Sequence, residues 1–145
     1  MAIKIYTAGK MAGLPYEKQM AWREEIENAI RDRTNKQITF IHPPKFYTYD
    51  RPDFQSEKEV KDWELNQVRN CDIVIANLDG INTSVGTHFE LSAVDSINST
   101  SNKHIFIIGF GDTEIQLHPW IELSLHRKET NIDDVADYIV RYLLV

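Results

Sequence analysis

The sequence predicts an α/β protein, a flavodoxin-like (Rossmann-like) three-layer sandwich around a parallel sheet of about five strands. Short apolar runs rich in β-branched residues, of which 73–78 is the clearest, alternate along the chain with segments of helical periodicity. Glycine, proline or aspartate follows most of these apolar runs. The chain has no linker and no internal repeat, so we expect a single domain spanning residues 1–145.

The N-terminal half supplies two strands and two helices. Ile3–Ala8 is the first strand, and Pro15 opens a helix with apolar residues at helical spacing. The second strand, Gln37–His42, is stopped by two prolines. Residues 45–54 then form a long loop with four aromatic side chains, which fits either a binding loop that stacks on a flat base or a contact between subunits. A helix follows over 57–70.

The C-terminal half continues the alternation. A helix begins at or just after Gly86, with Phe89, Ala93 and Val94 on one stripe. After it we expect a polar loop at 98–103, a strand at 104–110, a short helix after Pro119, a short strand near 126–129 and a last helix over 132–144 capped by Thr130 or Asn131.

Composition excludes several classes of function. The formal charge of −6, without a dense Lys/Arg cluster, argues against binding to a nucleic acid polymer. No apolar run approaches membrane-spanning length, so we expect no membrane partner and a cytoplasmic protein. Cys71 is the one cysteine and we expect a buried thiol; with the five scattered histidines it offers no metal-ligand spacing, so no metal is expected.

The turns after Ala8, His42 and Leu78 should converge, because ligands of parallel α/β sheets bind at the carboxyl ends of the strands. The turn that begins at Gly9 lacks the spacing of both the GxxxxGK[ST] phosphate loop and the GxGxxG dinucleotide fingerprint. ATP and NAD motifs are therefore absent. Gly9 either brings the backbone close to a ligand or only makes the turn.

Two glutamates point inward from helices. Glu90 precedes Ala93 and Val94 by three and four residues, which places it on the buried stripe and in the first helical turn. It is either a nucleophile beside an anion site or one half of a Thr87-x-x-Glu90 capping box. Glu64 lies four residues from both Val60 and Val68, so it is either a buried functional carboxylate or a rim residue that reaches water.

Three motifs occur near the expected carboxyl-end turns: Ile5-Tyr6-Thr-Ala-Gly9-Lys-Met, Glu64-Leu-x-x-Val-x-x-x-Asp72-Ile-Val and Gly86-Thr87-x-x-Glu90-Leu. With them most of the chain resembles the nucleoside 2-deoxyribosyltransferase family and its relatives that hydrolyse the N-glycosidic bonds of nucleotides. The resemblance implies a homo-oligomer, a nucleoside or nucleoside 5′-monophosphate as the small-molecule partner, and no cofactor.

The resemblance also implies roles for single residues. Glu90 is the implied nucleophile, with Tyr6 as the hydrogen-bond partner that orients it. Glu64 is implied to act near the leaving base, at a position where the family usually has Asp. Further substrate-binding positions implied by the resemblance are Gly9, Met11, His42, Gly86 and Thr87, and also Gln116 and His118, which align with residues that a neighbouring subunit contributes in the transferases and differ from them in type.

Position 84 bears on the substrate. Six residues before the nucleophile the transferases commonly have Asp, which receives the sugar 5′-hydroxyl, whereas the nucleotide hydrolases have Ser. This chain has Ser84, and a serine at a helix N-terminus favours a 5′-phosphate, to which Lys10 adds countercharge. We therefore expect an N-glycosidase acting on nucleoside 5′-monophosphates. The alternatives are a base-exchanging deoxyribosyltransferase on free nucleosides and a non-catalytic binding module on the same fold.

Overall fold

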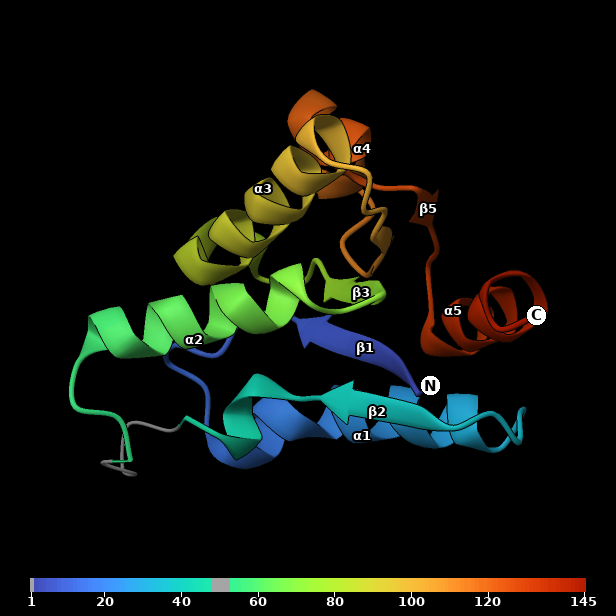
Figure 1. Ribbon diagram of the computed structural model, residues 1–145, viewed down its shortest axis with the longest axis horizontal. Coiled ribbons are helices and arrows are strands. Elements are labelled where there is room, and N and C mark those ends of the chain that lie inside the picture. The colour runs from blue at the N-terminus through green and yellow to red at the C-terminus, as the bar shows by residue number, and fades with distance from the viewer. Residues whose placement is uncertain (1, 48–52) are drawn as a thin grey trace.

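The structure is a computed structural model that describes residues 2–47 and 53–145, and its centre is one parallel sheet of five strands (Figure 1). The strand order is β2-β1-β3-β4-β5, with every adjacent pair parallel. The strands are β1 (Ile3–Ala8), β2 (Ile38–Ile41), β3 (Ile73–Asn77), β4 (Phe106–Phe110) and β5 (Arg127–Lys128). The predicted flavodoxin-like, five-stranded parallel sheet is confirmed.

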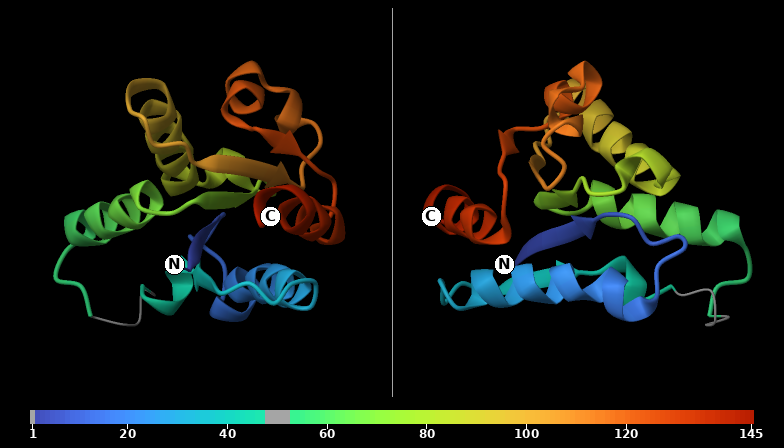
Figure 2. Two further views of the ribbon diagram at one scale, coloured as in Figure 1. Left: turned by 45° about the vertical axis from the view of Figure 1, so that its right-hand side comes forward. Right: turned by 180° about the vertical axis from the view of Figure 1, so that it is seen from behind.

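Helices cover both faces of the sheet, as the views in Figures 1 and 2 show. On one face α1 (Tyr16–Arg31) and α5 (Ile132–Tyr138) bury Ile26, Ile30 and Val135 against the sheet. On the other face α2 (Glu57–Arg69) and α3 (Val85–Thr100) bury Val68 and Val94. Because the central strands are covered on both sides, their continuous β-branched runs are the pattern that this layered architecture requires.

The ends of several elements differ from the expectation. Helix α3 begins at Val85, and it continues to Thr100 through part of the segment expected as a polar loop. The side chain of Asn98 explains this difference, because it hydrogen-bonds both the carbonyl and the amide of Ile105 at 2.8 and 2.7 Å. The polar residue therefore ties the end of α3 to the start of the next strand. Strand β5 is only two residues long.

The C-terminal region follows the predicted order. A short 3-10 turn (Ile115–Leu117) precedes α4 (Pro119–Ser124). The last helix begins after Asn131, whose side chain accepts a hydrogen bond from the amide of Asp134, and after Tyr138 it continues as a π-helical segment (Ile139–Leu143). The expected N-cap is thus Asn131 rather than Thr130.

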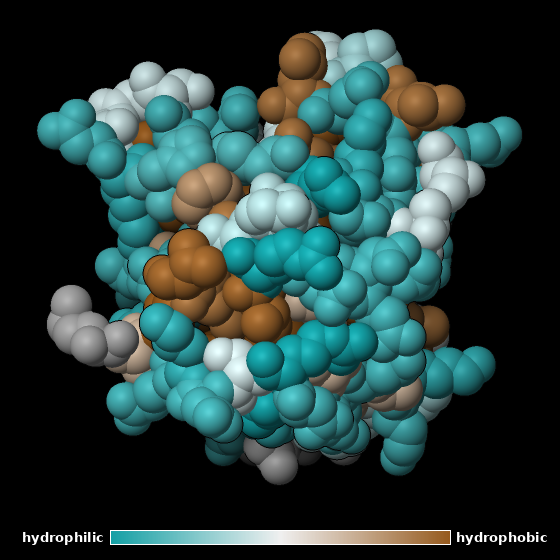
Figure 3. Space-filling view, turned by 90° about the vertical axis from the view of Figure 1, so that its right-hand side faces the viewer, coloured by the Kyte–Doolittle hydropathy of each residue, from teal (hydrophilic) through white to brown (hydrophobic). Residues whose placement is uncertain are grey.

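The single cysteine lies in the core. Cys71 is buried, as predicted, and burial raises the pKa of its thiol to about 12. The face of the molecule on the side of α5 is mainly hydrophilic, with separate apolar patches, and further apolar atoms gather at the top of the same view, where α3 and α4 lie in Figure 1 (Figure 3). Within residues 2–47 and 53–145, no helix has the length and apolar character to cross a membrane.

Candidate active site

A pocket of about 340 Å³ lies where the turns after β1 and β3 meet the N-terminal parts of α2 and α3. This is the carboxyl edge of the sheet, where ligands of such folds bind. The predicted site residues that line it are Gly9, Met11, Glu64, Ser84, Gly86, Thr87 and Glu90. The structure therefore brings together residues from all three sequence motifs.

Glu90 lies at this pocket with 6% of its surface exposed. Its Oε2 atom has no hydrogen-bond partner in the part of the chain that the structure describes. The capping-box interpretation is wrong, because α3 starts after Ser84 and Thr87 is the third residue within the helix. Glu90 is accordingly the sixth helical residue, not a first-turn residue, so the helix dipole acts on it only weakly.

Glu64 extends from α2 into the same pocket and is half-buried. Burial raises the pKa of Glu64. The positive charge of Arg23 opposes this rise, and the negative charge of Glu57 adds to it. Burial also raises the pKa of Glu90, the negative charge of Glu64 raises it further, and Tyr6 and Arg23 oppose the rise. Two carboxyl groups in one poorly solvated site titrate as a pair, and each makes the other harder to ionise.

Tyr6 is fully buried on β1 next to the carboxylate pair. Burial raises the pKa of its hydroxyl well above the ordinary value, and the charges of Glu90 and Glu64 add to the effect. The hydroxyl therefore stays protonated. Within the described residues Tyr6 Oη accepts or donates no hydrogen bond of normal length and angle. Tyr6 thus lies close enough to Glu90 for each group to influence the pKa of the other, and the hydrogen bond that the resemblance implies between them stays a prediction.

Arg23 is the main feature of the site that the sequence analysis missed. Its side chain is fully buried on α1, and burial lowers the pKa of the guanidinium to about 10, an effect that Glu90, Tyr6 and Glu64 oppose. The arginine donates hydrogen bonds to the Thr7 hydroxyl and to the Gly9 carbonyl, both at 3.2 Å. A signal was present: Arg23 lies three residues after Met20 and three before Ile26, within the apolar stripe of its helix.

Two hydroxyl groups lie at the other end of the pocket, at the N-terminus of α3. Ser84 is 8% exposed, and its Oγ lies 2.7 Å from Oγ1 of Thr87. The first amides of an α-helix have no acceptor within the helix, which makes a helix N-terminus favourable for an anion. Lys61, another residue that the sequence analysis missed, lines the pocket, and Lys10 donates to Thr83 at its rim at 2.6 Å.

Gly9 serves both packing and the pocket. A Cβ atom at this position would lie 2.7 Å from the Trp22 ring and 3.3 Å from Cβ of Asn77. Its backbone also lines the pocket. The two interpretations of this glycine are therefore compatible, since the close packing against Trp22 is what lets the turn lie at the pocket wall.

Besides Tyr6, which is fully buried, three aligned positions are outside the pocket lining: His42, Gln116 and His118. His42 is buried between Thr7 and Glu27, with Nδ1 2.8 Å from the hydroxyl and Nε2 2.6 Å from the carboxylate. The Gln116 amide donates to the carbonyls of Gly111 and Glu129. His118 is exposed and caps α4 through its Nδ1.

The aromatic loop lies partly outside the described residues, since positions 48–52 are not described. Its described members pack on α2: the ring centroids of Phe46 and Phe54 lie 4.8 and 5.9 Å from that of Trp63. Tyr47 lines the pocket, and its hydroxyl donates to Glu57 at 2.6 Å. Over the described ranges, no three His, Cys, Asp or Glu side chains form a group that could hold a metal ion.

Comparison with known proteins agrees with this architecture. No protein-family model and no curated protein matches the chain. A solved structure of a 2-deoxyribosyltransferase from Bacillus psychrosaccharolyticus is similar, with a TM-score of 0.66 and 22% identity over 93% of this chain and 91% of that one. A conserved protein from Enterococcus faecalis V583 gives a TM-score of 0.66 and 16% identity over 97% and 99%. The chain thus shares the fold of a 2-deoxyribosyltransferase over nearly its whole length.

Proposed function

We propose that the protein hydrolyses the N-glycosidic bond of a nucleoside 5′-monophosphate through a covalent intermediate on Glu90. The observation that carries this proposal is the buried Glu90 carboxyl group, which lies in a pocket with one oxygen unpartnered and beside a second carboxyl group. A buried carboxylate without a partner is costly for the folded protein. A role in chemistry accounts for a cost that packing does not.

The reaction has two displacements, as in retaining glycosidases. A Glu90 oxygen attacks the anomeric carbon, the bond from that carbon to the base nitrogen breaks, and its electron pair leaves with the base. In the reactive form Glu90 is ionised and Glu64 is protonated, and Glu64 delivers its proton to the base and becomes a carboxylate. Glu64 then removes a proton from water, which attacks the same carbon, so that the sugar phosphate leaves and both carboxyl groups regain their first states. Tyr6 orients Glu90, and no cofactor is needed.

The 5′-phosphate is supported by the groups at the N-terminus of α3. Ser84 and Thr87 offer hydroxyl groups at a place where helix amides attract anions. Lys61 in the lining and Lys10 at the rim supply positive charge. A carboxylate at position 84 would repel a phosphate dianion, whereas the serine that is present donates to it.

Base exchange on free 2′-deoxynucleosides is the second candidate, favoured by the fold shared with a 2-deoxyribosyltransferase. The same Glu90 ester would then be resolved by an acceptor base. A chromatographic screen of nucleosides and their monophosphates, with and without a second base, separates the candidates. Free base and sugar phosphate support the hydrolase, and a new nucleoside supports the transferase. Ligand binding without turnover would support a non-catalytic module.

We also propose that the protein is a homo-oligomer. Phe89 on α3 and Trp120 and Leu123 on α4 are 53%, 80% and 81% exposed, and they line a hollow of about 600 Å³. Large apolar side chains gathered in one hollow are typical of an interaction surface. Light scattering should report an oligomer at micromolar concentration, and Leu123→Asp should dissociate it; a monomeric wild type would contradict the proposal. His118 lies beside this surface, whereas the amide of Gln116 is engaged within its own chain.

A further inference from the structure

Arg23 holds a buried positive charge that forms no ion pair within residues 2–47 and 53–145. The side chain is fully buried, and its partners are the Thr7 hydroxyl and the carbonyls of Gly9 and Gln19. Its guanidinium lies 4.5 Å from the centroid of the Trp22 ring. Neutral groups therefore fix its position. One of them, Gly9, lines the same pocket as Glu64 and Glu90, and the charge of Arg23 opposes the rise in pKa of both carboxyl groups.

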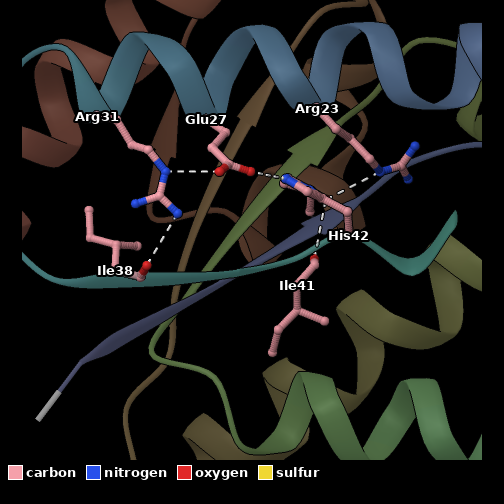
Figure 4. Close-up of polar contacts among 7 residues, drawn as sticks. Arg23, Glu27, Arg31, Ile38, Ile41 and His42 are labelled. Carbon is pink, nitrogen blue, oxygen red and sulfur yellow. Dashed lines mark hydrogen bonds and ion pairs between the residues drawn. The ribbon is translucent and has the colours of Figure 1, made fainter. Parts of the chain in front are cut away.

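A chain of hydrogen bonds joins this arginine to the surface (Figure 4). Glu27 contacts His42, His42 contacts Thr7, and Thr7 accepts from Arg23 Nε. None of these four residues lines the pocket, and Arg23 contacts the pocket lining through the carbonyl of Gly9.

We propose that Arg23 is a positioning residue that keeps the Glu64–Glu90 pair in its one-proton form, and that neutral His42 holds Arg23 in place through Thr7. The catalytic consequence rests on the proposed function, because one carboxylate and one carboxylic acid are what a nucleophile and an acid require. One carboxylate together with Arg23 is also electrically neutral, which is the state that a poorly solvated site favours.

The hydrogen atoms along the chain support neutral His42. Ionised Glu27 accepts from Nε2–H of His42, so Nδ1 accepts the Thr7 proton, and the Thr7 oxygen is left to accept from Arg23. If Nδ1 gained a proton, the hydroxyl would have to turn toward the Ile41 carbonyl at 3.4 Å and accept from two cations. The neutral imidazole satisfies every member of the chain.

The groups that face His42 and the carboxyl pair shift their pKa values in both directions. Burial lowers the pKa of His42, an effect that Glu27 opposes and that Lys45 and Arg23 reinforce. The carboxyl pair is faced by Arg23, Tyr6 and Glu57. Of these, Arg23 is the one that opposes protonation of both carboxyl groups by its charge. Without it both groups should retain their protons to higher pH, and the nucleophile would be lost at neutral pH.

The test is a carbon-13 NMR titration of glutamate side-chain carboxyl groups, assigned with Glu64→Gln and Glu90→Gln. At pH 7 the wild type should show one ionised and one protonated member of the pair. In Arg23→Met, release of the first proton should move upward by about one pH unit or more. Arg33→Met is the matched control, since Arg33 pairs with Asp133 and Asp137 on the surface, and it should leave the titration unchanged.

Two results would overturn the inference. One is a wild-type pair that is fully ionised or fully protonated at pH 7, a measurement that does not require Arg23→Met to fold. The other is an unchanged titration in folded Arg23→Met. Thr7→Val, which keeps the charge of Arg23 and removes its link to His42, should shift the titration in the same direction by less. If the wild type releases base but folded Arg23→Met titrates like the wild type, only the role of Arg23 is refuted. If the carboxyl groups titrate as expected but the wild type releases base from no substrate, only the proposed function is refuted.

Discussion

Glu27 and Glu90 are both partly or fully removed from water, and the protein treats them in opposite ways. Glu27 lies on the α1 side of the sheet, where Arg31 contacts it at 2.8 Å and His42 at 2.6 Å. Partial burial favours its protonated form, but these hydrogen bonds and charges outweigh burial and lower its pKa. Glu90 has no cation in hydrogen-bond contact among the described residues, and burial raises its pKa.

The difference separates a structural carboxylate from a candidate catalytic one. A buried carboxylate that is paired is explained by its partners, whereas one that lies unpartnered in a pocket costs stability and needs another explanation. In the network of Figure 4, Glu27 is bonded to both Arg31 and His42, whereas Oη of Tyr6 and Oε2 of Glu90 have no hydrogen-bond partner among the described residues.

The largest expected effect is the loss of activity in Glu90→Gln. Glutamine keeps the size of the side chain but forms no glycosyl ester, so base release should fall by roughly a thousandfold or more. The matched variant Glu27→Gln should lose far less activity, because Glu27 lies outside the pocket and is linked to Arg23 only through His42 and Thr7 in the described contacts. Rates of base release measured by chromatography check both. Similar losses of activity in the two variants would contradict the assignment of Glu90 as catalytic and Glu27 as structural.

The next effect concerns the phosphate end of the pocket. Removing one charge-assisted hydrogen bond costs about 1.5–3 kcal/mol, so Ser84→Ala should lower kcat/KM for a monophosphate roughly ten- to a hundredfold. Ser84→Asp should lower it further, because a carboxylate would face the dianion, and free nucleoside should be affected far less. The wild type should prefer the monophosphate.

Steady-state kinetics on matched nucleoside and monophosphate pairs provide the measurement. A wild type that acts faster on the free nucleoside, together with equal effects of Ser84→Asp on both substrates, would contradict the phosphate proposal and favour the transferase. Thr83→Ala is a useful control, since Thr83 lies at the rim and receives a hydrogen bond from Lys10. Its effect should be smaller than that of Ser84→Ala.

A smaller effect should appear in stability as a function of pH. The raised pKa of Glu90 means that the folded state binds its proton more tightly than the unfolded state, so this group's contribution falls as pH rises above about 4.5. The lowered pKa of Glu27 has the opposite sign, and its contribution is lost as pH falls through its folded value. A tenfold difference in proton affinity between the folded and unfolded states corresponds to about 1.4 kcal/mol of stability.

Urea denaturation at several pH values tests these signs. Between pH 5 and 8, Glu90→Gln should gain stability relative to the wild type as pH rises, whereas Glu27→Gln should be less stable than the wild type at neutral pH and approach it in acid. A stability difference that does not depend on pH in either variant would mean that the two environments differ less than their contacts indicate.

The sequence predicted the parts of the molecule that follow from periodicity. Alternating strands and helices gave the sheet, and the inward position of Glu90 followed from its spacing to Val94. Helix ends were harder to predict. Thr87-x-x-Glu90 fits a capping box by sequence, whereas in the structure the N-cap is Ser84 and the helix begins at Val85. Only the folded chain shows which of two neighbouring hydroxyl residues lies at the N-cap.

Partners from distant elements were also beyond the sequence. Arg23 became important because Thr7 and Gly9, from the first strand and its turn, fold over it. His42 was expected to bind substrate, yet it lies between Thr7 and Glu27 behind the pocket wall. In both cases the residue type was visible in advance, and its role depends on contacts that no local pattern encodes.

The most direct test of the central claim is mass spectrometry of the intact protein, quenched in acid during turnover of a 2′-deoxynucleoside 5′-monophosphate. Double displacement predicts an adduct of one deoxyribose phosphate per chain, located on Glu90 by peptide mapping and absent from Glu90→Gln. Base release without any adduct at early times and under slow-turnover conditions, or an adduct on another residue, would contradict the role of Glu90 as the nucleophile.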